Sequence, residues 1–124
     1  MKAIVVDDSR TIRMMLKRFL TEQGFTTLFE AGDGKEALAK LKEVGPVELA
    51  LVDWNMPVMD GLELVTTLRQ DSAFAKTRVM MVTTESEAAQ MTRAMNAGAN
   101  AYIIKPFNNE TLRGKLDALG FVKP

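Results

Sequence analysis

Short apolar runs alternate with longer segments along the whole chain. Several of the runs are rich in β-branched residues, which is typical of buried strands. They predict five strands, at residues 3–6, 25–30, 49–52, 79–82 and 101–104. In the longer segments apolar positions recur three or four residues apart, which indicates helices with one buried face. Five helices are therefore expected, between residues 9 and 24, 33 and 45, 62 and 68, 85 and 97, and 108 and 120.

Residues with side-chain oxygens stand where several of these helices should begin. Ser9 and Asp33 are predicted to accept a hydrogen bond from the first helical turn, and Asn108 or Asn109 does so for the last helix. Gly98 stands where the fourth helix should end, since glycine adopts a left-handed helix stop without strain.

The alternation of strands and helices predicts an α/β fold. Helices that connect parallel strands cover both faces of the sheet, and each connection must be right-handed. No linker, repeat or shift in composition divides the chain, so a single domain is expected over residues 1–124. A closed barrel is the alternative, but barrels of this kind normally need about eight strand–helix units. The pattern therefore favours a doubly wound, five-stranded parallel sheet.

Composition narrows the function classes. Apolar residues make up 47% of the chain, enough for a proper core. The 16 basic and 16 acidic residues cancel, which argues against a sequence-independent grip on nucleic acid. Without cysteine or histidine the chain has no disulfides, no thiol nucleophile, no Ser-His-Asp triad and no histidine metal site. The apolar start reaches Asp7 too early for a signal peptide or membrane span, so a cytoplasmic protein without membrane contact is predicted.

Polar side chains with useful chemistry follow the predicted strands. Asp7 and Asp8 follow the first strand, Asp53 the third, Thr83 the fourth and Lys105 the fifth. The carboxyl ends of the strands line the ligand crevice of an open α/β sheet. Three carboxylates, one hydroxyl and one ammonium group are therefore expected to share one pocket.

Three carboxylates in one pocket require either raised pKa values or a bound cation. Oxygen ligands with room for water are typical of Mg²⁺ sites. One Mg²⁺ ion together with Lys105 would balance the three carboxylates, and a nearly neutral pocket can accept an anionic phosphoryl group. Thr83 can donate a hydrogen bond to a phosphoryl oxygen.

Each of these residues also has a purely structural interpretation. Asp7 and Asp8 can favour the dipole of the helix that follows them, and Thr83 can cap a helix. Asp53 can simply start the loop predicted at residues 53–61. The lysine can be a solvated surface residue. The joint placement of all five at strand ends is what favours a functional pocket.

Four segments of the chain together resemble a known family. They are Val-Val-Asp-Asp-Ser at 5–9, Leu-Val-Asp-Trp-Asn-Met-Pro-Val-Met-Asp-Gly at 51–61, Val-Thr-Thr-Glu at 82–85, and Ala-Gly-Ala-Asn-Ala-Tyr-Ile-Ile-Lys-Pro-Phe at 97–107. Over its whole length the chain resembles the receiver domains of bacterial two-component response regulators, and most of all the stand-alone chemotaxis members. The resemblance implies a flavodoxin-like (βα)5 fold with strand order 2-1-3-4-5.

The resemblance also implies roles for single residues. Asp53 would accept the phosphoryl group from the phosphohistidine of a sensor histidine kinase. One Mg²⁺ ion would be bound by the side chains of Asp8 and Asp53, by the main-chain carbonyl of Asn55, and by Asp7 through a water molecule. Lys105 would pair with the phosphoryl group, and its bond to the following proline would be cis.

Further positions bear on switching and on the lifetime of the signal. Thr83 and Tyr102 would form the switch pair, with Thr83 moving toward the phosphoryl group and Tyr102 swinging inward. Similar members of the family have the same residue types at the positions of Asn55 and Glu85, and these types favour fast self-dephosphorylation. An acyl phosphate that lasts seconds to minutes is therefore expected.

A partner surface is expected around Met91, Met95 and Tyr102. If Met91 is exposed, its adaptable side chain suits such a surface; the alternative is that Met95 and Met91 belong to the core. By resemblance the partners would be a chemotaxis-type histidine kinase and a downstream target such as the flagellar motor switch, and the protein would be a monomer.

Three alternatives stand beside a chemotaxis switch. An aspartate-nucleophile phosphohydrolase usually has a second aspartate two residues after the nucleophile as general acid, whereas this chain has Asn55. A flavodoxin-like electron carrier needs a phosphate-binding loop after the first strand, where Asp7 and Asp8 would repel a flavin phosphate. The third is a receiver cut from a longer regulator, or one acting as a phosphate sink or relay. A stand-alone protein is expected, because no linker or effector domain follows Gly120.

Overall fold

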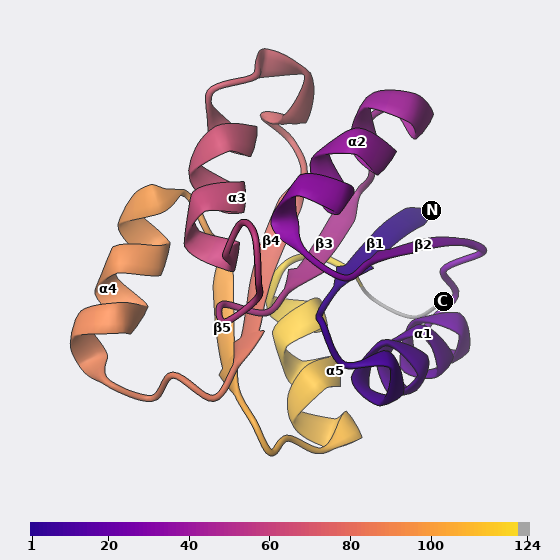
Figure 1. Ribbon diagram of the computed structural model, residues 1–124. Coiled ribbons are helices and arrows are strands. Elements are labelled where there is room, and N and C mark those ends of the chain that lie inside the picture. Colours follow the sequence, from indigo (N-terminus) through magenta and orange to yellow (C-terminus); the bar gives the residue numbers. More distant parts are fainter. Residues whose placement is uncertain (122–124) are drawn as a thin grey trace.

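Five parallel strands lie between two layers of helices in the computed structural model, which describes residues 1–121 (Figure 1). The strands are β1 (Lys2–Val6), β2 (Thr27–Ala31), β3 (Leu49–Val52), β4 (Arg78–Thr83) and β5 (Ala101–Ile104). The helices are α1 (Arg10–Glu22), α2 (Gly34–Val44), α3 (Gly61–Arg69), α4 (Ala88–Ala97) and α5 (Asn109–Ala118), and a short 3-10 helix, η1 (Ser72–Phe74), follows α3. None of the helices in the described part of the chain has the length and apolar character needed to cross a membrane.

The strand order is β2-β1-β3-β4-β5, and all neighbouring strands are parallel. This confirms the doubly wound sheet with order 2-1-3-4-5. The direction of winding reverses between β1 and β3, which is where ligands bind in open α/β sheets. Val6 pairs with Val52 in the register of these two strands, and the Asp53 N–H donates to the Val6 carbonyl at 2.9 Å. The residues that follow β1 and β3 are therefore neighbours.

The two faces of the sheet carry two separate apolar cores. Successive strand residues point to opposite faces. Ile4 and Val6 of β1 pack with α2, α3 and α4, whereas Ala3 and Val5 pack with α1 and α5. Figure 1 shows these two helical layers on either side of the sheet. Because the inner strands are buried on both faces, they are almost continuously apolar, and this made them recognisable in the sequence.

Helix capping follows the sequence at several ends. The side chains of Ser9, Asp33 and Asn108 each accept a hydrogen bond from the main-chain N–H three residues later, at distances between 2.8 and 3.3 Å. Of the two asparagines considered for α5, Asn108 is the cap. Gly98 ends α4 in the left-handed conformation with φ of 118°, as predicted.

The start of α4 differs from the prediction. The helix begins at Ala88, whereas the sequence pattern placed it from residue 85. Its N-cap, Glu87, makes no side-chain capping bond. Glu85 instead forms hydrogen bonds to residues of other elements, described below. These bonds keep residues 85–87 out of the helix.

Two further boundaries also differ from the sequence pattern. β2 begins at Thr27, and Phe25, which was included in this strand, is buried but precedes it. The predicted loop at residues 53–61 ends one residue earlier, because Asp60 caps α3 and Gly61 is its first residue. The sequence showed that Phe25 is apolar and that Asp60 and Gly61 favour a turn. It did not show which of these residues take part in the hydrogen bonds of the strand or helix.

The methionines of α4 divide between core and surface. Met91 packs against the core and Ala94, three residues on, is fully buried. Met95 is 44% exposed, which excludes the alternative that it belongs to the core. The reason is geometric: one residue beyond Ala94 the helix has turned by about 100°, which points Met95 away from the sheet.

Candidate functional site

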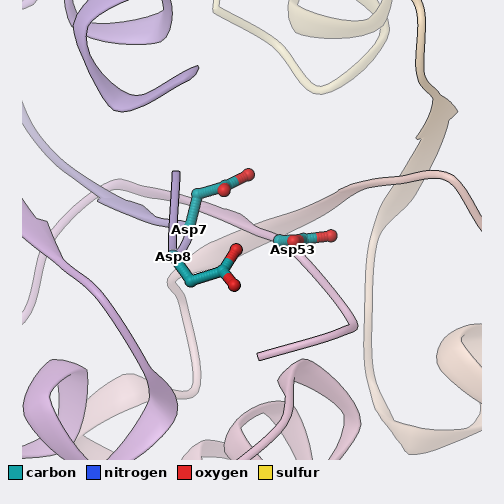
Figure 2. A group of neighbouring side chains, drawn as sticks. All are labelled: Asp7, Asp8 and Asp53. Atoms are coloured by element: carbon teal, nitrogen blue, oxygen red, sulfur yellow. The ribbon is translucent and has the colours of Figure 1, made fainter. Parts of the chain in front are cut away.

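Three aspartates meet at the carboxyl ends of β1 and β3. Asp7, Asp8 and Asp53 each offer a carboxylate oxygen, and these oxygens lie within 4.8 Å of one another (Figure 2). Asp7 and Asp53 are buried and Asp8 is exposed. The predicted grouping of the three carboxylates is confirmed.

Lys105 reaches the same pocket from the end of β5. Its Nζ donates a hydrogen bond to Asp7 Oδ2 at 2.8 Å and lies 3.6 Å from Asp53 Oδ2. The Lys105 N–H donates to the Thr83 carbonyl at 2.8 Å, and the peptide bond to Pro106 is cis, as the resemblance implied. The lysine side chain is only 16% exposed, so it is a pocket residue and not a solvated surface lysine.

The electrostatics of Asp53 reflect its crowded surroundings. Burial raises the pKa of the Asp53 carboxyl above its ordinary value, and the nearby Lys105 ammonium opposes this rise. Asp7 and Asp8 raise the pKa further through like-charge repulsion, while the Trp54 N–H acts in the other direction. Burial is therefore the main reason that the pKa is raised, and an added positive charge would favour the ionised form of this carboxylate.

The three carboxylates fit a divalent cation, but they are not equivalent. Both oxygens of Asp7 already accept hydrogen bonds, Oδ1 from the Ser9 N–H at 2.8 Å and Oδ2 from Lys105. Asp8 and Asp53 are better placed to offer oxygens as direct ligands. A set of oxygen ligands with one exposed member suits a hard cation that keeps part of its water shell.

Glu85 joins the loop after β3 to the loop after β4 and to β5. Its Oε1 accepts a hydrogen bond from Asn55 Nδ2 at 2.8 Å, and its main-chain carbonyl accepts one from the Tyr102 hydroxyl at 2.7 Å. The Glu85 N–H donates to Thr83 Oγ1 at 3.2 Å. Thr83 is fully buried and Tyr102 is 6% exposed, so the tyrosine ring points inward in this structure. Burial, followed by the charges of Glu85 and Asp53, raises the Tyr102 pKa.

Two residues of the site region had no predicted part in it. Arg13 of α1 donates a hydrogen bond from Nη1 to the Asp7 main-chain carbonyl at 2.6 Å. Gly61 approaches Asp53 so closely that a Cβ atom on it would lie 2.1 Å from the Asp53 carbonyl oxygen. Both relations join residues of different elements, and no sequence pattern signals them.

A groove of about 440 Å³ lies outside the acidic pocket. It is lined mainly by α1, including Met14, Met15 and Phe19, and by Asn109 at the start of α5. None of the predicted site residues lines this groove. The acidic pocket is therefore identified by its chemistry and not by its volume.

Fold, strand order and acidic pocket together define a class of phosphate-accepting signalling domains. Residues 3–117 match the family described as the response regulator receiver domain, and the chain belongs to this family. It is a signalling protein and not an enzyme in the ordinary sense, which removes the phosphohydrolase and the electron carrier as alternatives.

Individual relatives narrow the class to CheY-like response regulators of the chemotaxis type. The chain is 42% identical to the chemotaxis protein CheY1 of Helicobacter pylori over 119 residues, which cover 96% of both chains. It is 41% identical to the chemotaxis protein CheY-3 of Vibrio cholerae over 119 residues, which cover 96% of this chain and 91% of the relative. The solved structure of the chemotaxis response regulator CheY4 of Vibrio cholerae has 37% identity and a TM-score of 0.87, with 95% of this chain and 97% of that chain covered. The resemblance drawn from the four sequence segments is confirmed.

Proposed function

We propose that Asp53 accepts a phosphoryl group from the phosphohistidine of a sensor histidine kinase in a reaction that depends on Mg²⁺. The observation that carries this proposal is the position of the Asp53 carboxylate. It lies nearly buried at the switch point of the sheet, grouped with Asp7 and Asp8, and 3.6 Å from the Lys105 ammonium group.

The transfer needs positioning and charge more than it needs further chemical groups. A bond forms between an Asp53 carboxylate oxygen and phosphorus while the bond from phosphorus to the histidine nitrogen breaks, and the electron pair of that bond stays on the imidazole. Lys105 is placed to pair with the phosphoryl oxygens. A Mg²⁺ ion held by Asp8, Asp53 and the Asn55 main-chain carbonyl would supply two further positive charges, with Asp7 acting through a water molecule.

The switch would use the contacts around Glu85. In this proposal Thr83 Oγ1 leaves the Glu85 N–H for a phosphoryl oxygen, and the inward Tyr102 fixes the new arrangement of the loop. The exposed part of α4, with Met95 and the partly buried Met91, would then change its shape for a partner.

The protein would act as a cytoplasmic monomer with one domain over residues 1–124. Its partners would be a chemotaxis-type kinase and a target such as the flagellar motor switch. Recovery of only a kinase with a phosphate mimic would instead indicate a relay or phosphate sink.

Intact mass tests the phosphoacceptor directly. After incubation with acetyl phosphate and Mg²⁺, the native protein should gain the mass of one phosphoryl group, and chelation of the cation should prevent this. Asp53→Asn should gain none, because an amide oxygen cannot form the acyl phosphate. Asp33→Asn is the matched control, since it makes the same change at a helix cap where asparagine is equally suitable.

The outcome that overturns the proposal is full retention of the added mass by Asp53→Asn.

The same samples report the lifetime of the acyl phosphate. Asn55 and Glu85 are hydrogen-bonded to each other, and family members with these residue types at the two positions dephosphorylate quickly, so the added mass should decay within seconds to minutes. A half-life of hours in Mg²⁺ buffer would contradict fast self-dephosphorylation.

A further inference from the structure

Arg13 of α1 is in contact with the main chain of the acidic pocket. Its Nη1 donates to the Asp7 carbonyl oxygen at 2.6 Å, and its Nε donates to Glu30 Oε1 at 2.8 Å. The side chain is 17% exposed. A guanidinium group carries its donors in one rigid plane, so the bond to Glu30 fixes the direction of the bond to Asp7.

Glu30 holds the guanidinium group from the neighbouring strand. It belongs to β2, where it pairs with Val5 of β1, and it also accepts a hydrogen bond from Lys17. The hydrogen bonds from Lys17 and Arg13 lower the Glu30 pKa, so this residue is a carboxylate at neutral pH. Arg13 is therefore fixed between α1, β1 and β2.

Every polar group of Asp7 has a partner. Its N–H donates to the Ala31 carbonyl at 3.1 Å. Its Oδ1 accepts from the Ser9 N–H and its Oδ2 from Lys105, both at 2.8 Å. Arg13 satisfies the remaining group, the main-chain carbonyl. Asp7 is thus held from several elements at once.

The carbonyl that Arg13 holds belongs to the peptide unit between Asp7 and Asp8. A peptide unit is planar, so fixing its carbonyl also fixes the N–H and the Cα of Asp8. Asp8 is exposed, and no hydrogen bond or ion pair to another residue within 1–121 holds its carboxylate. Its place in the pocket therefore depends on the main chain, and Arg13 holds the carbonyl of the peptide unit that leads into Asp8.

We propose that Arg13, held by Glu30, is a positioning residue for the binding of a divalent cation by the three aspartates. This inference rests on the proposed function of the pocket. The charge of Arg13 by itself would have the opposite effect, because a nearby positive charge repels a cation. Positioning and charge thus predict opposite signs when Arg13 is lost, and the two explanations can be separated.

The dissociation constant of Mg²⁺, measured by isothermal titration calorimetry, decides between them. Arg13→Met should bind Mg²⁺ about tenfold more weakly, within the range seen when residues that support metal ligands are removed. Arg18→Met is the matched control: it removes the same charge from an exposed position of α1 and should leave the affinity unchanged or slightly tighter. Arg13→Lys keeps the charge but loses the rigid planar pair of donors that spans Asp7 and Glu30. The lysine variant should bind Mg²⁺ several-fold more weakly than native protein. It replaces Arg13→Met in this test if Arg13→Met does not fold.

Phosphoryl uptake supplies a second readout. Arg13→Met should need about tenfold more Mg²⁺ than native protein for the same rate of mass gain from acetyl phosphate. A native or tighter Mg²⁺ affinity in the folded Arg13 variants overturns the inference while leaving the phosphoacceptor intact. If native protein itself neither binds Mg²⁺ nor gains phosphoryl mass, the proposed function fails, and the inference fails with it.

Discussion

Val58 has a main-chain conformation that its side chain disfavours. Its φ is 67° and it is 76% exposed, in the loop between Asp53 and α3. A β-branched residue at positive φ is strained. The neighbouring residue explains why the conformation persists, since the Met59 carbonyl accepts a hydrogen bond from the Gly34 N–H at 3.0 Å and fixes the loop against α2. The strain is thus imposed by the anchoring of the loop beside the pocket.

Replacing Val58 should relieve this strain. Val58→Asn is expected to raise the free energy of unfolding by about 1 kcal/mol, because asparagine adopts the left-handed region far more readily than valine. Urea unfolding followed by circular dichroism measures the change. Val58→Thr retains the β-branch and should give no gain. Equal stability of the two variants would show that the positive φ carries no strain.

The residues of the pocket were predictable to different degrees. Asp7, Asp53 and Lys105 follow strands, and the carboxyl ends of parallel strands meet at one edge, so their grouping could be predicted. Arg13 could not be found in the same way, because its bond to Asp7 depends on how α1 packs against the sheet. The choice between core and surface for Met91 and Met95 was left open for a similar reason: apolar spacing alone did not show which of the two methionines faces the core.

At the scale of elements, the start of α3 is packed against the end of β3. Gly61 opens this helix, and its N–H donates to the Trp54 carbonyl at 2.9 Å. The space for a Cβ atom is taken by the Asp53 carbonyl oxygen. The helix can therefore begin at this place only with glycine, and the close packing also fixes the main chain of Asp53.

Two glycine substitutions should have opposite effects on stability. Gly61→Ala is expected to lower the free energy of unfolding by about 1–3 kcal/mol, because main-chain atoms of Asp53 must move to admit the methyl group. Gly114→Ala in α5 is the control, since nothing lies within 4 Å of its Cβ position. It should raise stability by about 0.5–1 kcal/mol through helix propensity. Thermal unfolding of both variants measures this, and a shift in the same direction for both would refute the packing argument.

Element types were more predictable than element boundaries. The apolar runs gave β3 (Leu49–Val52) and β5 (Ala101–Ile104) with the bounds observed, because both are short and bounded by polar residues. The late start of α4 was missed, since it depends on the bonds of Glu85 to Asn55 and Tyr102 across the fold. Hydrophobic spacing carries no information about such tertiary bonds.

For the whole molecule, the apolar pattern predicted five parallel strands but not their order. Periodicity identifies a strand and its faces, and it leaves the neighbours of that strand open. The order 2-1-3-4-5 came from the family resemblance and is confirmed by the pairing of β1 with both β2 and β3. The switch point, and hence the site, follows from that order.

Stability should depend on pH partly through Glu30, which joins β2 to α1. Its folded pKa is lowered, so its stabilising contribution is present above the unfolded pKa of about 4.3 and is lost as the pH falls through the folded pKa. The side chain is 40% exposed, so solvent screening should keep the effect below about 1 kcal/mol. Glu30→Gln should be less stable than native protein at pH 7, and this difference should shrink toward about pH 3.

Urea unfolding of both proteins across this pH range tests the dependence. Added salt should reduce the difference at neutral pH, because the ion pairs of Glu30 with Arg13 and Lys17 are partly exposed. A difference that widens as the pH falls would have the wrong sign for a carboxylate with a lowered pKa.

Trp54 is the only tryptophan of the chain, and it stands next to Asp53. The residue is 7% exposed, and the Arg93 guanidinium of α4 lies 5.7 Å from the ring centre. The light that an indole emits depends on the charges and solvent around it. A single ring therefore lies between Asp53 and the helix that carries Met91 and Met95, so its emission should report a change at either place without an added dye.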